Sequence, residues 1–145
     1  MRHDSIKKPE QQKKTDDRIK KLLEYLPVQQ DILMAFVFGS FVSRDMTAIS
    51  DLDVALLFDG KIEFSRVGII REELSDLLGI DVDVVVLNTA APVIKMQILK
   101  KGRLLHVRER RAYNEFFVTT VKEYDDLKRN RKEIEDNILK GRVYA

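Results

Sequence analysis

Runs of apolar residues along the chain predict three β-strands and a short fourth. They span residues 32–38, 54–58, 82–87 and 103–107. The first run, ILMAFVF, is continuously apolar, which is typical of a strand buried on both faces of a sheet. The third, VDVVVL, is rich in β-branched residues, which pack well on a pleated surface. The pattern therefore predicts a sheet with a buried centre.

Apolar residues spaced three and four positions apart predict helices before, between and after these strands. The expected helices span residues 16–26, 64–78, 92–101 and 111–140. Gly79 and Gly102 follow the second and third of them, where a glycine commonly ends a helix. In the last helix the apolar stripe thins from Lys128 onward, as expected of a helix end that protrudes or meets a partner. The alternation of strands and helices indicates the α/β class.

The length of 145 residues and the apolar content of 44% fit one domain. We expect this domain to span residues 15–145, after a flexible basic tail at residues 1–14. The sequence predicts neither a membrane span nor a secretory signal, because it has no long apolar run and its first residues are polar. The absence of cysteine excludes disulfides, thiolate metal ligands and a thiol nucleophile. Together these features predict a cytoplasmic protein.

The small net charge of +2 hides an uneven distribution. Residues 1–21 hold eight basic and four acidic side chains, residues 22–99 hold five and twelve, and residues 100–145 hold thirteen and eight. A solvated helix surface is the favoured interpretation of the basic flanks. The alternative interpretation is a surface that meets an acidic partner or a nucleic acid. We do not expect direct nucleic-acid binding.

Aspartates lie at or just before the start of the second and third predicted strands. Side chains at alternate positions of a strand share a face, so Asp51 and Asp53 converge while Leu52 faces the core. Asp81 and Asp83 share a face of the third strand in the same way. If the two strands are neighbours, Asp83 joins the other two carboxylates. Such an oxygen-only site suits Mg²⁺, and paired metal ions of this kind serve phosphoryl and nucleotidyl transfer.

The segment FGSFVSRD follows the first predicted strand. A glycine in the turn after a strand lets the backbone approach a phosphate closely, and a helix start offers N–H groups to the anion. We therefore expect Gly39 and Ser40 to bind a triphosphate and residues 40–44 to form a helical turn. A lone Gly-Ser is a common turn and Asp-x-Asp is often a cap, so the hypothesis depends on their combination.

The stretch GSFVSRDMTAISDLD resembles the GSx10DxD signature of the minimal nucleotidyltransferases, a branch of the DNA polymerase β-like superfamily. Within that branch the chain is most similar to the MntA-type antitoxins that are paired with HEPN-domain toxins. The tail from Leu87 to Phe116 resembles the same subfamily. The resemblance implies a mixed β-sheet packed with helices, in an α/β (α+β) fold with a long C-terminal helix.

The resemblance also implies roles for individual residues. Gly39 and Ser40 would contact the triphosphate of ATP, and Asp51 and Asp53 would hold Mg²⁺. Asp83 would complete the metal site and help deprotonate the attacking hydroxyl. Asp81 is interpreted as a flanking residue. Many relatives continue Gly-Ser with x-Ala-Arg-Gly, whereas this chain has Phe-Val-Ser-Arg, so Arg44 receives no role.

For the antitoxin subfamily, the resemblance implies that the acceptor is a tyrosine of a HEPN ribonuclease, which AMP transfer would silence within a hetero-oligomer. Two alternatives stay open. One is transfer of a nucleotide to a small molecule such as an aminoglycoside, and the other is a binding-only antitoxin without catalysis. His106 alternates with apolar neighbours and is interpreted as a structural residue.

Overall fold

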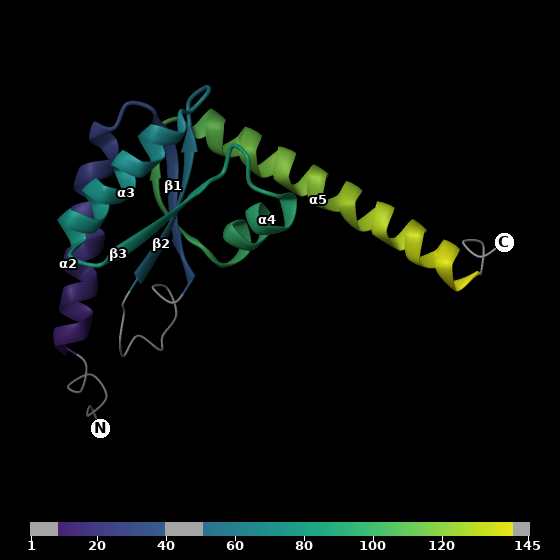
Figure 1. Ribbon diagram of the computed structural model, residues 1–145, viewed down its shortest axis with the longest axis horizontal. Helices are drawn as coiled ribbons and strands as arrows, with labels where there is room; N and C mark the ends of the chain where they lie inside the picture. The colour runs from purple at the N-terminus through teal and green to yellow at the C-terminus, as the bar shows by residue number, and fades with distance from the viewer. Residues whose placement is uncertain (1–8, 40–50, 141–145) are drawn as a thin grey trace.

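A four-stranded sheet lies between two pairs of helices in the computed structural model, which describes residues 9–39 and 51–140 (Figure 1). The elements in chain order are α2 (Pro9–Tyr25), the 3-10 helix η1 (Leu26–Val28), β1 (Ile32–Phe38), β2 (Asp51–Phe58), α3 (Phe64–Leu78), β3 (Asp81–Val86), α4 (Pro92–Lys101), β4 (Arg103–Val107) and α5 (Arg110–Leu139). The strands, α3, α4 and the long C-terminal helix confirm the expected α/β class. Within the described ranges, no helix is apolar over enough of its length to cross a membrane.

The sheet is mixed, in the spatial order β3-β2-β1-β4. Strand β1 is antiparallel to both of its neighbours, β2 and β4, whereas β2 and β3 run parallel. Helix α3 connects the two parallel strands, because a parallel crossover needs a connection that returns along the sheet. The start of β2, the start of β3 and the end of β1 consequently lie at one edge of the sheet.

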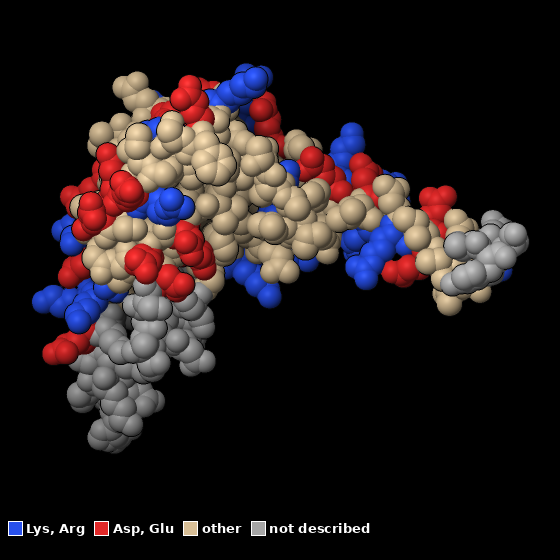
Figure 2. Space-filling model, in the orientation of Figure 1, with Lys and Arg blue, Asp and Glu red and all other residues tan. Residues whose placement is uncertain are grey.

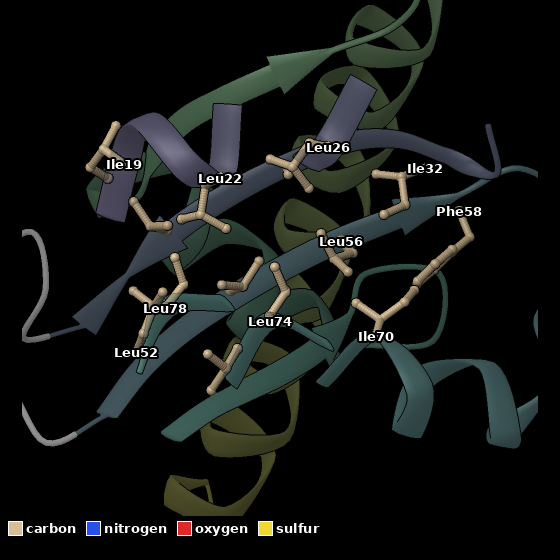
Figure 3. Close-up of a cluster of buried hydrophobic side chains, with 14 residues drawn as sticks. Ile19, Leu22, Leu26, Ile32, Leu52, Leu56, Phe58, Ile70, Leu74 and Leu78 are labelled. Atoms are coloured by element: carbon tan, nitrogen blue, oxygen red, sulfur yellow. The ribbon is translucent and has the colours of Figure 1, made fainter. Parts of the chain in front are cut away.

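The pleat of β2 divides its side chains between two cores. Its even-numbered residues from Leu52 to Phe58 join a buried cluster with α2 and α3, which Figure 3 shows. Its odd-numbered residues face the other side, where Ala55 packs in a second cluster with Ile98 of α4 and Phe116 of α5. Both faces of the central strands are therefore covered, which explains why β1 is apolar at every position.

Two expected boundaries were wrong by three residues or more. Helix α2 begins at Pro9 and not at residue 16, so residues 9–14 are helical and the expected flexible tail was too long. Strand β2 begins at Asp51 and not at residue 54. The helical turn expected at residues 40–44 lies outside the described residues, as do residues 1–8.

Helix α5 is the longest element, with 30 residues, and its second half extends away from the body of the molecule (Figure 1). Phe116 and Thr120 are buried near its start, whereas Ile134 is 59% exposed. The basic excess counted over residues 100–145 does not belong to α5, which holds seven basic and seven acidic side chains. Figure 2 shows the two signs interspersed along it. The basic excess of this region lies in residues that flank the helix.

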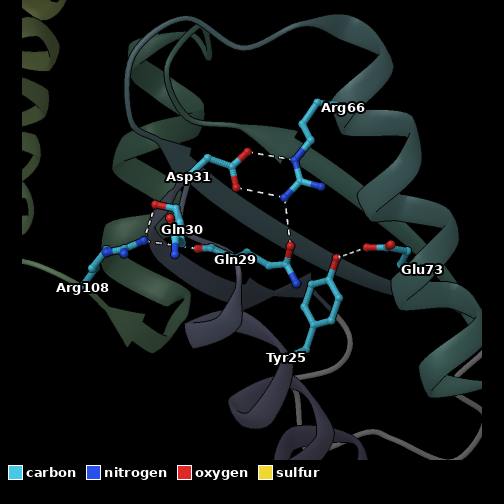
Figure 4. A network of polar contacts seen from close by, with 7 residues as sticks. All are labelled: Tyr25, Gln29, Gln30, Asp31, Arg66, Glu73 and Arg108. Atoms are coloured by element: carbon cyan, nitrogen blue, oxygen red, sulfur yellow. Dashed lines mark hydrogen bonds and ion pairs between the residues drawn. The ribbon is translucent and has the colours of Figure 1, made fainter.

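A network of polar side chains ties α3 to the start of β1, at the opposite end of the sheet from Asp51 (Figure 4). Arg66 donates two hydrogen bonds to the Asp31 carboxylate, at 2.8 and 2.9 Å, and this lowers the pKa of Asp31. The Tyr25 hydroxyl donates to Glu73 at 2.7 Å, and burial together with this bond raises the pKa of Tyr25. The network therefore stabilises the packing of α2 and α3 at the start of β1, and it does not involve the aspartates at the start of β2 and β3.

His106 should make the fold sensitive to mild acid. Its buried Nε2 atom has no hydrogen-bond partner among the described residues, and burial, with a smaller effect from the charge of Arg108, lowers its pKa. The folded chain then binds a proton at His106 less tightly than the unfolded chain, so stability falls as the pH drops below about 6.5. Urea unfolding at pH 7.5 and 5.5 should show a lower free energy of unfolding at pH 5.5. The pH dependence should be smaller in His106→Leu, and an equal dependence in both proteins would contradict this assignment.

Candidate active site

Three strands deliver the predicted site residues to one edge of the sheet. Because β2 and β3 are parallel, Asp51 lies opposite Asp81 and Asp53 lies opposite Asp83 in the strand register. Because β1 is antiparallel to β2, Phe38 at the end of β1 lies opposite Asp53. Gly39 follows directly. The structure thus brings together Gly39 and the three aspartates that the sequence singled out.

The pleat places the carboxylates on one face. Leu52 and Val82 alternate with the aspartates and are buried on the face of α2 and α3. The aspartates lie on the opposite face, where Asp51 and Asp83 are exposed and Asp53 is half-buried. The strand positions are held by the apolar core, so the carboxylates have little freedom to move apart.

Gly39 contacts Asp53 more closely than any other residue type would allow. Its backbone has a φ of 79°, in the left-handed region, and a Cβ atom built on it would lie 2.5 Å from Oδ2 of Asp53. The motif predicted only a phosphate contact for this glycine, whereas its packing against the carboxylate depends on the pairing of β1 with β2. Ser40 and Arg44 lie outside the described residues.

The pKa of Asp53 is raised, first by burial and then by the charges of Asp51 and Asp83. The three carboxylates therefore repel one another at the ends of two neighbouring strands. A like-charge cluster of this kind is relieved by a cation, and perturbed carboxylates of this kind are typical of functional sites. The electrostatics favour a bound cation at Asp53.

The donor set fits Mg²⁺, which prefers oxygen ligands. Among residues 9–39 and 51–140, no group of three or more His, Asp or Glu side chains lies close enough together to hold a metal ion by itself. A Mg²⁺ ion at these carboxylates would therefore need further ligands from water and substrate phosphates, which Mg²⁺ commonly uses. Asp51, Asp53 and Asp83 would hold such an ion together with a bound triphosphate.

An acidic groove of about 560 Å³ opens beside the aspartates, between the start of β3 and helix α3. Its lining residues are Asp51, Arg71, Glu72, Ser75, Asp76, Asp81, Val82 and Asp83. Arg71 is the only basic side chain of this lining and was not among the residues predicted for the site. Its place on the exposed side of the predicted helix was readable, but which groove that side borders was not.

An apolar pocket of about 700 Å³ lies on the other side of the site, between β3 and α4. Its lining residues are Phe38, Gly39, Val85, Val93, Ile94, Gln97, Ile98 and Lys101. Gly39 borders this pocket and also touches Asp53, so the two features are continuous. This pocket was not predictable from the sequence, because it depends on how α4 packs on the sheet.

Carboxylates on adjacent strands beside a glycine turn are compatible with metal-assisted transfer of a phosphate-containing group. The chain belongs to the polymerase β nucleotidyltransferase family, whose model matches residues 20–111. The nucleotidyltransferase class expected from the sequence is confirmed by this match.

Similar proteins show which members of this family the chain resembles. The chain is 28% identical over 121 residues to the protein adenylyltransferase MntA of Shewanella oneidensis, covering 83% of this chain and 84% of that protein. One chain of the solved toxin-antitoxin pair MntA-HepT matches with a TM-score of 0.62 and 25% identity, over 88% of this chain and 98% of that one. A toxin-antitoxin structure with AMP-PNP shares the fold, with a TM-score of 0.70, 24% identity, and coverage of 83% and 98%. These similarities confirm the resemblance to MntA-type antitoxins.

Proposed function

We propose that this chain transfers AMP from ATP to a tyrosine hydroxyl of a HEPN-domain toxin and thereby neutralises the toxin. The observation that carries this proposal is the meeting of Asp51, Asp53 and Asp83 beside Gly39 at one edge of the sheet. The similarity to a protein adenylyltransferase, at 28% identity over most of both chains, supports AMP as the group transferred.

In the proposed reaction, the acceptor oxygen forms a bond to the α-phosphorus of ATP. The bond between that phosphorus and the oxygen leading to the β-phosphorus breaks, and pyrophosphate leaves with its electron pair. The hydroxyl proton passes to the carboxylate of Asp83, which is exposed and available to an incoming acceptor. Asp51 and Asp53 would hold Mg²⁺, which neutralises charge on the triphosphate when bound.

The rigid sheet accounts for the protein's own part in catalysis. Asp53 and Asp83 lie on paired positions of β2 and β3, so the group that takes the proton and the group that holds the cation keep a fixed separation. Gly39 holds the end of β1 against Asp53, which is where we place the triphosphate. Positioning and charge compensation are the main tasks in this class of reaction.

The acidic groove favours a protein acceptor over a nucleic acid. Five carboxylates line it, and they border the site from the side of α3. A nucleic acid would bring one negative phosphate per nucleotide into this groove, and binding of such a chain depends on neutralisation by basic side chains. A protein segment carries no such repeated charge and can approach Asp83.

The test is transfer of label from α-labelled ATP with Mg²⁺ to the purified HEPN partner. Label should appear on the partner, and it should be lost with Asp51→Ala/Asp53→Ala and when the acceptor tyrosine is replaced by phenylalanine. Asp59→Asn, at the exposed far end of β2, is the matched control and should transfer normally. Stable complex formation without transfer from any of the four nucleotides would instead indicate a binding-only antitoxin.

A further inference from the structure

The apolar pocket beside Gly39 has no role in the chemistry described above. Its walls are formed by Phe38, Val85, Val93, Ile94 and Ile98. Val93 and Ile94 are 44% and 46% exposed, which is unusual for aliphatic side chains that gather around one hollow. Exposed apolar walls with few polar groups are typical of small-molecule sites, and the volume of about 700 Å³ lies in their usual range.

The pocket lies one step along the sheet from the aspartates. Val85 follows Asp83 by two positions on β3, so it shares the face of Asp83 and lies about 7 Å further along the strand. Gly39 forms the other connection, since it borders the pocket and contacts Asp53. A molecule whose phosphates lie at the aspartates can therefore place its next rigid group in this pocket.

We propose that this pocket holds the adenine base of the donor nucleotide and that the Gln97 amide selects adenine over guanine. The proposal rests on the proposed function, in which ATP is the donor. Gln97 lies in the middle of α4, among the apolar residues that line the pocket, and apart from Lys101 it is the only long polar side chain in the lining.

The chemistry of the lining matches a purine. A flat base buries its two faces against aliphatic and aromatic side chains, which here come from β1, β3 and α4. The edge of adenine presents an N–H donor at N6 next to an acceptor at N7, which a glutamine amide meets with its oxygen and its NH₂ group. Guanine presents two acceptors at the corresponding positions, so the glutamine oxygen would face another acceptor.

The experiment is equilibrium binding by calorimetry, with Mg²⁺ and either ATP, GTP or inorganic tripolyphosphate. The native chain should bind ATP more tightly than GTP. Gln97→Ala should weaken ATP binding by roughly tenfold, bring the ATP and GTP affinities close together, and leave tripolyphosphate binding unchanged. Ile94→Ser should weaken binding of both nucleotides. Ile69→Ser is the matched control, because Ile69 is 49% exposed on α3, away from the pocket.

Binding and transfer are measured separately, so the two proposals can fail separately. Nucleotide binding that depends on Gln97, without transfer to the HEPN partner, would keep the base pocket and reject the proposed transfer. Transfer by the native chain with ATP affinity unchanged in both Gln97→Ala and Ile94→Ser would overturn the base pocket. A rise in the KM for the partner in those variants would then assign the pocket to the acceptor.

Discussion

Replacement of Asp53 by asparagine should abolish AMP transfer and at the same time stabilise the fold. The substitution keeps the size of the side chain and removes one charge from the cluster with Asp51 and Asp83. We expect transfer to fall by about 100-fold or more, since loss of a charged cation ligand costs several kcal/mol of transition-state stabilisation. Labelled ATP and the HEPN partner measure this loss.

The gain in stability follows from the raised pKa of Asp53. A raised pKa means that the folded chain binds a proton at Asp53 more tightly than the unfolded chain, so stability falls as the pH rises above the ordinary value of 3.8. At pH 7 and without divalent ions, Asp53→Asn should therefore raise the Tm by about 1–4 °C. The gain should disappear below pH 3.8, where the carboxyl is protonated in both states.

Added Mg²⁺ and ATP provide the control for this interpretation. They should raise the Tm of the native chain, because a ligand that binds only the folded state stabilises it, and they should have a much smaller effect on Asp53→Asn. Mg²⁺ alone should raise the Tm of the native chain less than Mg²⁺ with ATP, since no group of three or more described side chains could hold the ion without further ligands. A variant that keeps its transfer activity, or loses stability at pH 7, would contradict the assignment of Asp53.

The spacing of apolar residues predicted most of the helices and strands, because apolar side chains occur where the chain is buried. The continuous apolar run of β1 reflects a strand covered on both faces. The alternation around Asp51 and Asp53 reflects a strand that starts with polar side chains on one face and apolar side chains on the other. The start of α2 was missed because residues 9–14, PEQQKK, contain no apolar side chain to show a helical period. Pro9 at the first helical position was the available signal.

The site was predictable only in part, because its geometry also depends on how strands and helices distant in the sequence pack together. Spacing within strands identified Asp51, Asp53 and Asp83 as candidates, but the parallel register that places Asp53 opposite Asp83 comes from the crossover through α3. Arg71 and Gln97 lie on helices whose exposed sides were clear from periodicity, while the groove and the pocket that they border depend on helix packing. The basic excess of residues 100–145 could not be assigned to one element from the regional count, because that region contains both α5 and its flanks.

Replacement of Gly39 by alanine should reduce AMP transfer through a collision with Asp53. The new Cβ atom would lie 2.5 Å from Oδ2 of Asp53, so the carboxylate has to leave its position. The left-handed backbone, with a φ of 79°, adds about 1–2 kcal/mol of strain. We expect transfer to fall by about tenfold or more, since a small displacement of a group that holds the cation is costly.

Gly79→Ala is the control that separates the effect of the collision with Asp53 from the effect of backbone strain. Gly79 has a φ of 71° at the end of α3, and a Cβ atom there would meet nothing within 4 Å, so the variant should lose stability and keep its transfer activity. A double-mutant cycle on stability tests the contact itself, because the cost of Gly39→Ala should fall to that of Gly79→Ala once Asp53 is alanine. Equal activity of Gly39→Ala and Gly79→Ala would show that Gly39 serves only the turn after β1. A non-zero coupling energy with lost transfer would show that the glycine is needed because the carboxylate lies against it.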